Sequence, residues 1–384
     1  MPDTVLGILG GGQLGRMLAL AARRMNLRTV VWTGGQGPPT ARVADEWIDK
    51  PFDDPSAFER FVSEATVATI EFENIPALTL RAVARHMPLH PSPDVVETCQ
   101  NRWLEKSFLH RHGIPCAAFA RVRDEGELAA AMRRIEGPWV LKTAASGYDG
   151  RGQLRVARDA DPAEIWKRFG PTTGVLEQWI PLACEISAIV VRGADGAGVV
   201  FDPAENQHRD GILDWSLAPA RVPDGLGARA RGIAVELAEL LGLRGVMCVE
   251  FFVSQDGELL VNELAPRPHN SGHHTLDACA TSQFEQQLRA VTGLPLGSTR
   301  LLTPAAMLNL TGELWPAGGT PDWHPLFADG AAMLHLYGKP EASPRRKMGH
   351  ACFVGSCAEE ALARALALRD SWLADAARAQ EICA

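Results

Sequence analysis

The first 32 residues have the order strand, glycine turn, helix, strand, which is the opening of a βαβ unit. Residues 5–9 are apolar, three glycines follow at 10–12, residues 13–25 carry apolar side chains at helical spacing, and residues 28–32 (Arg-Thr-Val-Val-Trp) form a second predicted strand. The strands of such a unit pair in parallel, because the helix returns the chain to the same end of the sheet. The chain therefore opens with a parallel sheet, and residues 67–71 are predicted as a later strand of it.

Gly10, Gly12 and Gly15 satisfy the dinucleotide-binding pattern G-x-G-x-x-G between a strand and a helix. A nicotinamide site also needs an acid about 20 residues further on, at the end of the second strand, to bind the ribose hydroxyls. Here the strand ends at Trp32, and no carboxylate follows until Asp45. A nicotinamide cofactor is therefore disfavoured. A phosphate or ribonucleotide at the helix N-terminus and a merely tight turn both stay open.

The composition indicates a globular protein of two or three domains, with 384 residues of which 46% are hydrophobic. The formal net charge of −8 and the lack of a long Lys/Arg run argue against an extended nucleic-acid surface. Eight cysteines without a C-x-x-C pair indicate reduced thiols. No basic leader precedes the first strand, and no apolar run reaches about 18 residues. We therefore expect a soluble cytoplasmic protein without a membrane or nucleic-acid partner.

Glu250 and Glu263 lie at mirror positions about Asp256-Gly257, between two runs rich in β-forming residues. Asp-Gly in this setting is typical of a hairpin with a type I′ turn, which would set Glu250 directly opposite Glu263. Two carboxylates that close repel unless a proton or a cation lies between them, and Mg²⁺ prefers oxygen ligands. We therefore predict a Mg²⁺ site on this hairpin. The alternative is a solvated hairpin with two outward acids.

A glycine-rich loop at residues 146–153 follows a predicted strand that ends in Lys142. Glycine lets backbone N–H groups approach phosphate oxygens, and lysine supplies a compact positive charge, so the combination is typical of a phosphate site. The loop lacks the G-x-x-x-x-G-K-[ST] order of a P-loop, and an ordinary hairpin loop is the alternative. Residues 177–180 end a further predicted strand, where their backbone and Glu185 could bind an adenine and a ribose.

Two further polar segments lie in the second half of the chain. Residues 263–274 contain Arg267 and three histidines, but the absence of H-E-x-x-H and of a nearby cysteine set disfavours zinc. Arg267 beside a Mg²⁺ and a phosphoryl group would instead bind an anionic intermediate. Residues 339–350 form the most cationic stretch, which is either a phosphate anchor or a solvated face. Pro340 and Pro344 predict that this stretch is irregular and not helical.

Taken together, these motifs resemble the ATP-grasp superfamily and, within it, the N5-carboxyaminoimidazole ribonucleotide synthetases of purine biosynthesis. The resemblance covers nearly the whole chain and rests most heavily on Gly147-Tyr-Asp-Gly-Arg-Gly-Gln153 and Arg267-Pro-His-Asn-Ser-Gly-His273. It also uses residues 10–18, 71–74, 262–263 and 346–350. It implies an ATP-dependent carbon–nitrogen ligase, expected as a homodimer, that carboxylates 5-aminoimidazole ribonucleotide with bicarbonate through carboxyphosphate.

The resemblance implies a fold of mixed α/β and α+β class in three parts. A βαβ domain would span residues 1–97, an ATP-grasp domain 98–295 with a mobile lobe at about 123–182, and a small C-terminal domain 296–384. Residues 91–97 and 193–198 look like surface insertions. Periodicity predicts helices at 100–112, 125–135 and 227–241, and strands at 139–142, 175–179, 185–192 and 197–201.

The resemblance also implies roles for individual residues. Glu250 and Glu263 would hold Mg²⁺, and Arg267, His269 and Asn270 would stabilise carboxyphosphate. The residues implied for ATP are Arg102, Lys142, Gly147, Tyr148, Asp149, Gly150, Arg151, Gly152, Gln153, Glu177, Gln178, Trp179, Ile180, Glu185, His208, Asn262 and Glu263. Those implied for the ribonucleotide are Gln13, Leu14, Glu71, Glu73, Tyr148, Arg151, Lys339 and Arg346, with Glu71 and Glu73 on one face of a strand.

Other functions compete with this one. Formate-dependent glycinamide ribonucleotide transformylase and biotin carboxylase share the ATP clamp, but the former would have an acid in place of Asn270 and the latter would be longer. An NAD-dependent oxidoreductase and a catalytically inactive nucleotide sensor are alternatives of different classes. Nucleotide turnover with both substrates present would separate the sensor from the enzymes.

Overall fold

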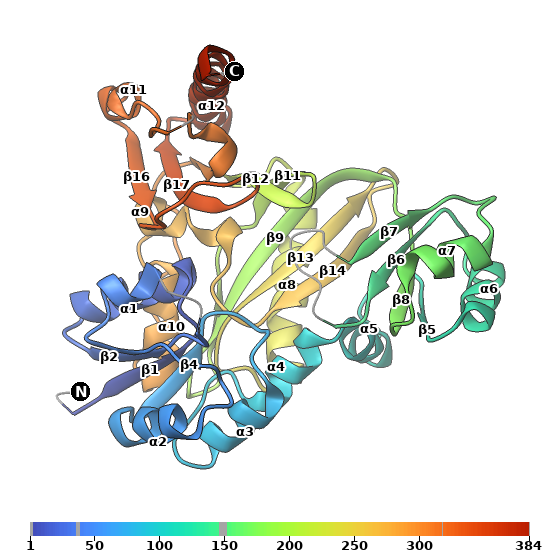
Figure 1. Cartoon of the computed structure of the whole chain (residues 1–384), viewed down its shortest axis with the longest axis horizontal. Coiled ribbons are helices and arrows are strands. Elements are labelled where there is room, and N and C mark those ends of the chain that lie inside the picture. Colours follow the sequence, from blue (N-terminus) through green and yellow to red (C-terminus); the bar gives the residue numbers. More distant parts are fainter. Residues whose placement is uncertain (1–2, 36–38, 146–151, 317, 384) are drawn as a thin grey trace.

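The computed structural model describes residues 3–35, 39–145, 152–316 and 318–383, and its strands form three sheets (Figure 1). The N-terminal sheet, blue in the figure, is parallel with the order β3-β2-β1-β4, which confirms the predicted βαβ opening. Helix α1 covers one face of this sheet and α2 covers the other. The elements are β1 (Val5–Leu9), α1 (Gln13–Arg24), β2 (Arg28–Trp32), β3 (Glu46–Ile48), α2 (Pro55–Glu64), β4 (Val67–Ile70) and α3 (Ala77–Ala84).

The glycine turn between β1 and α1 is filled by a side chain of the protein itself. The amides of Gly12 and Gly15 donate to the two carboxylate oxygens of Glu71, at 2.9 and 3.0 Å. A Cβ atom at Gly10 would overlap the Glu71 Cγ atom and lie 2.6 Å from Phe72 Cδ1, and one at Gly12 would lie 2.8 Å from a Glu71 oxygen. The glycine pattern is therefore explained by close packing against Glu71, and the helix N-terminus already has its anion.

The central sheet has nine strands in the order β14-β13-β9-β11-β12-β15-β17-β16, with β10 beside β9. Helix α8 packs on one face of β9 and β13, and α10 packs on the other while also contacting α1. Alternate residues of β13 therefore point to opposite faces. The elements are β9 (Leu182–Arg192), β10 (Gly198–Val200), β11 (Ala204–Arg209), β12 (Ile212–Ala218), α8 (Asp224–Leu240), β13 (Gly245–Ser254), β14 (Leu259–Ala265), α9 (Thr275–Ala278) and α10 (Gln283–Thr292).

A separate four-stranded antiparallel sheet forms the lobe at the right of Figure 1, with the order β5-β8-β6-β7. Helices α6 and α7 pack against this sheet through an apolar core of its own. Helix α5 stands between this lobe and the central sheet in the figure. The elements are α5 (Arg102–Arg111), β5 (Phe119–Val122), α6 (Glu125–Arg134), β6 (Trp139–Thr143), β7 (Gln153–Val156), α7 (Pro162–Phe169) and β8 (Gly174–Gln178).

The C-terminal strands extend the central sheet, because β12 pairs with β15. The predicted third part of the chain thus shares a hydrogen-bonded sheet with the second. Helix α12 packs on β15 and β17 and closes a core with Trp372 and Leu326. The elements are β15 (Ala305–Thr311), α11 (His324–Ala328), β16 (Ala332–Leu336), β17 (Lys347–Val354) and α12 (Ala358–Cys383). Among the described helices, none is long and apolar enough to cross a membrane.

Two expectations about local structure are wrong. Residues 91–97 are not a surface insertion, because they begin helix α4 (Pro93–Gln100), whose Val95 and Val96 are buried. The hairpin of β11 and β12 was not predicted, although its turn, Asp210-Gly211, has positive φ at both residues, as a type I′ turn requires. Strand β11 (Ala-Glu-Asn-Gln-His-Arg) carries no apolar alternation that would have revealed it in the sequence.

We predict that Gly10→Ala lowers the free energy of unfolding by about 3 kcal/mol or more. The new Cβ atom would be both strained, at φ +105°, and in collision with Glu71 and Phe72. Gly113→Ala is the matched control, because Gly113 also has a positive φ, +69°, but has nothing within 4 Å of its Cβ position. The control should cost only about 1 kcal/mol. Denaturant unfolding of both variants checks this, and equal losses would contradict the packing argument.

Candidate active site

The predicted carboxylate pair lies on β13 and β14, where Glu250 is the direct cross-strand partner of Glu263. The predicted turn between them is wrong. Only Gly257 of the dipeptide has a positive φ, +81°, and Ser254 N donates to Glu258 O at 2.9 Å, so the loop has three residues instead of two. This is the type I turn followed by a left-handed residue that three-residue hairpins commonly use.

A β-bulge at Asn262 restores the register that the longer turn removes. Glu250 pairs with Glu263 while the next residue, Phe251, pairs with Val261, so Asn262 is the extra residue. The side chains show the same shift, because Val261 and Leu264, three residues apart, both enter the core on the α8 side. Without the bulge Glu263 would point to the opposite face of the sheet. The pairing of the two carboxylates was thus predicted correctly, but from a two-residue turn that is not present: a three-residue loop and a bulge together give the same pairing.

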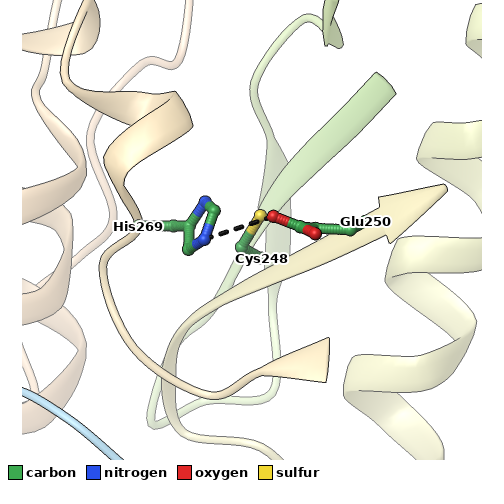
Figure 2. Close-up of side chains that lie close together, drawn as sticks. All are labelled: Cys248, Glu250 and His269. Atoms are coloured by element: carbon green, nitrogen blue, oxygen red, sulfur yellow. Dashed lines mark ion pairs between the residues drawn. The ribbon is translucent and has the colours of Figure 1, made fainter. Parts of the chain in front are cut away.

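Glu250 is surrounded by groups that disfavour its charge. Its pKa is raised to about 7, first by burial and then by the neighbouring carboxylates of Glu263 and Glu185, against the lowering effect of His208. The Glu250 carboxylate lies 3.3 Å from His269 Nε2, and Figure 2 shows these two side chains pointing toward one another beside Cys248. Burial lowers the pKa of His269 well below its usual value, so this imidazole stays neutral.

These residues fit a hard divalent cation better than zinc. A cation between Glu250 and Glu263 would relieve their mutual repulsion and would find carboxylate oxygens as ligands. Ligand atoms of Cys248, Glu250 and His269 also lie within 4.8 Å of one another, but burial raises the pKa of the Cys248 thiol, whereas zinc needs the thiolate. The two carboxylates are therefore the residues that could hold a hard divalent cation, and the predicted Mg²⁺ site stays a prediction.

The segment after β14 supplies the groups predicted to bind an anion. Arg267 pairs with Glu73. Burial raises the pKa of Glu73, but the charge of Arg267 outweighs this effect and the pKa is lowered overall, so the pair is ionised. Asn270 Oδ1 is buried and accepts no hydrogen bond from the described part of the chain. His269 Nδ1 lies 2.9 Å from Ser271 Oγ, which also accepts a hydrogen bond from Ser187 at 2.8 Å. His269 and Arg267 thus lie near Glu250, and the predicted role of Arg267, His269 and Asn270 in binding an anion stays a prediction.

Glu71 and Glu73 do not share a strand face. Strand β4 ends at Ile70, and the chain then bends, so the two side chains separate. Glu71 binds the start of α1, and burial raises its pKa despite the two backbone donors. Glu73 instead pairs with Arg267. The prediction failed because the i, i+2 rule holds only while the backbone stays extended.

Six of the residues predicted for the nucleotide form ion pairs with one another. Lys142 Nζ donates to Glu177 Oε2 at 2.9 Å, and this carboxylate has its pKa lowered to about 2, because burial, which raises the value, is outweighed by Lys106 and Lys142. Arg102 lies 3.9 Å from Glu263. A third pair joins His208 Nδ1 to the Glu185 carboxylate, 2.7 Å away. Burial lowers the pKa of the His208 imidazole, but Glu185 raises it above its usual value.

The residues at the end of β8 use part of their backbone hydrogen-bonding capacity within the fold. The amides of Gln178 and Trp179 donate to the carbonyls of Ala118 and Pro138, both at 2.9 Å, so neither amide is available to an adenine in this conformation. The Trp179 ring instead carries the Arg155 guanidinium 4.5 Å from its centroid. Ile180 begins the return to the central sheet. A cavity of about 1080 Å³ borders Gln178 behind α5, but the carboxylate pair does not line it.

Five of the predicted loop residues lie outside the described part of the chain: Gly147, Tyr148, Asp149, Gly150 and Arg151. The loop re-emerges at Gly152, which has φ +70° and whose carbonyl accepts from Thr143 N at 2.8 Å. Gln153 then begins β7 with an exposed side chain. The predicted roles of the five residues stay predictions.

The cationic stretch is irregular, as the prolines predicted, and it connects β16 to β17. Lys339 Nζ donates to Gln13 Oε1 at 3.2 Å and to the Lys347 carbonyl at 2.7 Å, so it joins the stretch to the start of α1. Arg346 donates to the Glu341 carbonyl at 2.9 Å. The Leu14 side chain is buried in the core of the N-terminal domain, so Leu14 can contact a ligand only through its backbone.

The whole chain matches proteins of one enzyme family. The family models for the ribonucleotide synthetase preATP-grasp domain, the ATP-grasp domain and the phosphoribosylaminoimidazole carboxylase C-terminal domain match residues 3–100, 107–284 and 305–364. N5-carboxyaminoimidazole ribonucleotide synthase of Bacillus subtilis is 42% identical over 354 residues, which cover 92% of each chain. The chain belongs to the N5-carboxyaminoimidazole ribonucleotide synthase family. The synthase of Brucella melitensis is also 42% identical, over 91% of this chain and 96% of its own.

Solved structures of this synthase family agree with the fold. An N5-carboxyaminoimidazole ribonucleotide synthetase in complex with ADP superposes with a TM-score of 0.89 at 40% identity, over 96% of this chain and 97% of its own. The Aspergillus clavatus synthase, in complex with ADP and 5-aminoimidazole ribonucleotide, gives 0.86 at 31% identity over 97% and 100%. Family membership, together with Glu71 at the α1 N-terminus, contradicts the NAD-dependent oxidoreductase alternative.

The structure places three charged residues at the synthase site that the sequence did not indicate. Lys347 lies close enough to lower the pKa of Glu73 and of His269, after the larger effects of burial and Arg267. Glu105 and Lys106 are buried on α5 and contact β14 directly. Lys347 stands in the cationic run and could have been proposed with it. Glu105 and Lys106 carry no signal, because adjacent charges on a helix are usually solvated.

We predict that Glu250→Gln reduces ATP turnover by about 10²–10³ and yet stabilises the metal-free protein at high pH. Loss of a preorganised charge accounts for the first effect. For the second, the pKa of Glu250 rises on folding from about 4.5 to about 7, so the cost of ionising it is nearly absent at pH 4, grows between pH 4.5 and pH 7 and is fully present above pH 7. The side chain is 17% exposed, and solvent screening reduces the expected gain at pH 8 to about 1–2 kcal/mol.

Turnover at saturating Mg²⁺ and unfolding free energies at pH 4 and pH 8 without metal check this prediction. Glu263→Gln should lose turnover to a similar extent. Glu258→Gln, at an exposed position in the same hairpin, is the control and should change neither quantity. Near-normal turnover in Glu250→Gln, or the same stability difference at both pH values, would contradict the assignment.

Proposed function

We propose that this protein carboxylates the exocyclic amine of 5-aminoimidazole ribonucleotide with bicarbonate at the expense of ATP. The products are N5-carboxyaminoimidazole ribonucleotide, ADP and phosphate, in purine biosynthesis. The observation that carries the proposal is the match along almost the entire chain to synthases of that name, 42% identical over 92% of both chains. The site geometry supports it, because carboxylates for a cation and an arginine for an anion meet beside a nucleotide clamp.

The first step joins bicarbonate to the γ-phosphoryl group. A bicarbonate oxygen attacks the γ-phosphorus, the bond to the β-phosphate oxygen breaks, and ADP leaves as carboxyphosphate forms. Glu250 and Glu263 would hold Mg²⁺, which when bound would supply positive charge to the phosphates. Lys142 and Arg102, from the two sides of the clamp, hold the phosphates in place. The protein supplies positioning and charge, with no covalent intermediate on a side chain.

The second step transfers the carboxyl group to the amine. The amine nitrogen attacks the carboxyl carbon of carboxyphosphate, or CO₂ released from it in place. The bond from that carbon to the phosphate oxygen breaks, and the departing phosphate takes up the amine proton. Arg267 is held by Glu73 and faces the site as a fixed positive charge for the anionic intermediate. The neutral imidazole of His269 offers a further hydrogen-bonding group, and the buried Oδ1 of Asn270 offers an acceptor. Carboxyphosphate reacts with water, so a closing loop at 147–153 would protect it.

Several finer points of the proposal rest on the family resemblance. They are the use of bicarbonate and Mg²⁺, a homodimeric state, a cytoplasmic location, and the division into parts at residues 97 and 295 with a mobile lobe at about 123–182. The described cysteines are all free thiols, which agrees with a reducing compartment. Sedimentation of the purified protein would test the dimer.

The reaction is tested by measuring phosphate release with ATP, 5-aminoimidazole ribonucleotide and bicarbonate, each omitted in turn. We expect release to require the ribonucleotide and bicarbonate together with Mg-ATP, and the carboxylated product to appear in equal amount. Glycinamide ribonucleotide with formate serves as the control substrate pair and should give no turnover. Release with formate, or none with any pair, would contradict the proposed reaction.

A second prediction concerns Lys339 and Arg346 as the anchor for the ribonucleotide phosphate. Lys339→Ala and Arg346→Ala should each raise the KM for the ribonucleotide about tenfold or more and leave the KM for ATP nearly unchanged, because each removes a charge remote from the reacting amine. A fall in kcat would show that this remote binding energy also orients the amine. Arg300→Ala, an exposed arginine outside the stretch, is the control. Unchanged constants in both variants would show that the stretch is a solvated face.

A further inference from the structure

Helix α5 carries two adjacent charged residues that are almost completely buried, Glu105 and Lys106, each 1% exposed. Lys106 Nζ donates to the carbonyls of Val261, at 3.2 Å, and Asn262, at 2.8 Å. Glu105 Oε2 accepts from the Leu264 amide at 2.9 Å. These backbone groups lie on both sides of Glu263, so two side chains of α5 bind the β14 backbone next to one of the two carboxylates of the proposed cation site.

The backbone needs these partners because β14 is the outer strand of the sheet and carries a bulge. Val261 faces away from β13, since its amide donates to the Pro115 carbonyl, and the extra residue Asn262 turns the next carbonyl to the same side. A buried carbonyl without a donor is costly, and an ammonium group offers three donors in charge-assisted bonds. Lys106 therefore stabilises the bulged form of β14 over a regular strand, in which Glu263 would face away from Glu250.

The same ammonium group also reaches the nucleotide clamp. Lys106 Nζ lies 3.7 Å from Glu177 Oε2, the oxygen that accepts from Lys142. Strand β8, which carries Glu177, belongs to the smaller lobe, whereas β14 belongs to the central sheet. Burial lowers the pKa of Lys106, but Glu177 and Glu105 raise it above its usual value, so the charge persists. The buried Lys106 ammonium group thus links β14, which carries Glu263, to β8, which carries Glu177.

We infer that Lys106, together with Glu105, is a positioning residue that holds the β14 bulge in the register that sets Glu263 opposite Glu250, and so determines the affinity of the divalent-cation site. The inference rests on the proposed role of that carboxylate pair. Lys106 acts through the backbone of Val261 and Asn262 and through Glu177, and not on substrate. It follows that the cation site should fail when Lys106 is removed, although both carboxylates are still present.

The test is the dissociation constant of Mn²⁺ in the presence of ADP, followed through the electron paramagnetic resonance signal of free Mn²⁺. Lys106→Met keeps the aliphatic stem and removes the charge, and it should weaken Mn²⁺ binding about 10- to 100-fold, as loss of groups supporting metal ligands typically does. In the metal-free variant, amide hydrogen exchange should accelerate across residues 259–265. If Lys106 only stabilised the fold as a whole, its loss would leave the Mn²⁺ dissociation constant unchanged, and faster amide exchange would not be centred on residues 259–265.

Arg244→Met is the control for the loss of a cation that binds main-chain carbonyls, here from a partly buried position. Arg244 donates to the carbonyls of Ala290 and Val291, at 2.9 and 3.0 Å, at the end of α10 and away from the hairpin. This variant should lose a comparable free energy of unfolding, but its Mn²⁺ affinity should equal that of the wild type. If Arg244→Met weakens Mn²⁺ binding as much as Lys106→Met, general destabilisation explains both and the inference is wrong.

A pair of variants at Glu105 keeps the test decisive if Lys106→Met does not fold. Glu105→Gln retains an acceptor for the Leu264 amide and should bind Mn²⁺ nearly as the wild type does, whereas Glu105→Leu should bind it about tenfold more weakly. Mn²⁺ affinities of Lys106→Met and Glu105→Leu within twofold of the wild type would overturn the inference. A wild type that binds Mn²⁺ but carboxylates no ribonucleotide would instead contradict the proposed reaction and leave this result valid.

Discussion

Glu250 and Glu263 are held face to face on neighbouring strands, and the repulsion between them shapes the site around them. The pair is tolerated because cations approach it from two directions, Arg102 at 3.9 Å from Glu263 and His208 through Glu185. The chain's own charges do not neutralise the pair completely, since the pKa of Glu250 is still raised to about 7. The metal-free fold thus contains an electrostatic repulsion that a divalent cation would relieve. Such a repulsion lowers the stability of the metal-free protein and raises the affinity of the site for a cation.

The site is assembled where three parts of the chain meet, and each junction is polar. Arg267 and Glu73 join the central part to the N-terminal domain, and Lys339 joins the C-terminal stretch to Gln13. A third junction consists of stacked imidazoles from His273, His350 and His335, with ring centroids 4.4 and 4.5 Å apart. The same junctions that fix the relative positions of the parts therefore also hold the residues predicted to bind the substrates.

Local sequence signals were sufficient wherever a short-range rule dictates the structure. The βαβ opening followed from apolar periodicity, and the irregular cationic stretch followed from Pro340 and Pro344. They were insufficient where two structures satisfy one pattern. G-x-G-x-x-G requires close approach to the backbone but does not say what approaches, and here it is Glu71. Asp-Gly predicts a type I′ turn, which Asp210-Gly211 forms and Asp256-Gly257 does not.

The sequence by itself determined the fold class, the parallel N-terminal sheet, the family, and the residue types that meet at the site. Those properties depend on periodicity and on motifs a few residues long, which the chain carries locally. Only the tertiary structure decided the register of β14, the separation of Glu71 from Glu73, and the burial of Glu105 and Lys106. The last two depend on partners more than 50 residues away in the chain, whereas the register of β14 depends on a turn and a bulge that short-range rules did not predict. A buried charge acquires its role from the group that it meets, and that meeting exists only after the chain has folded.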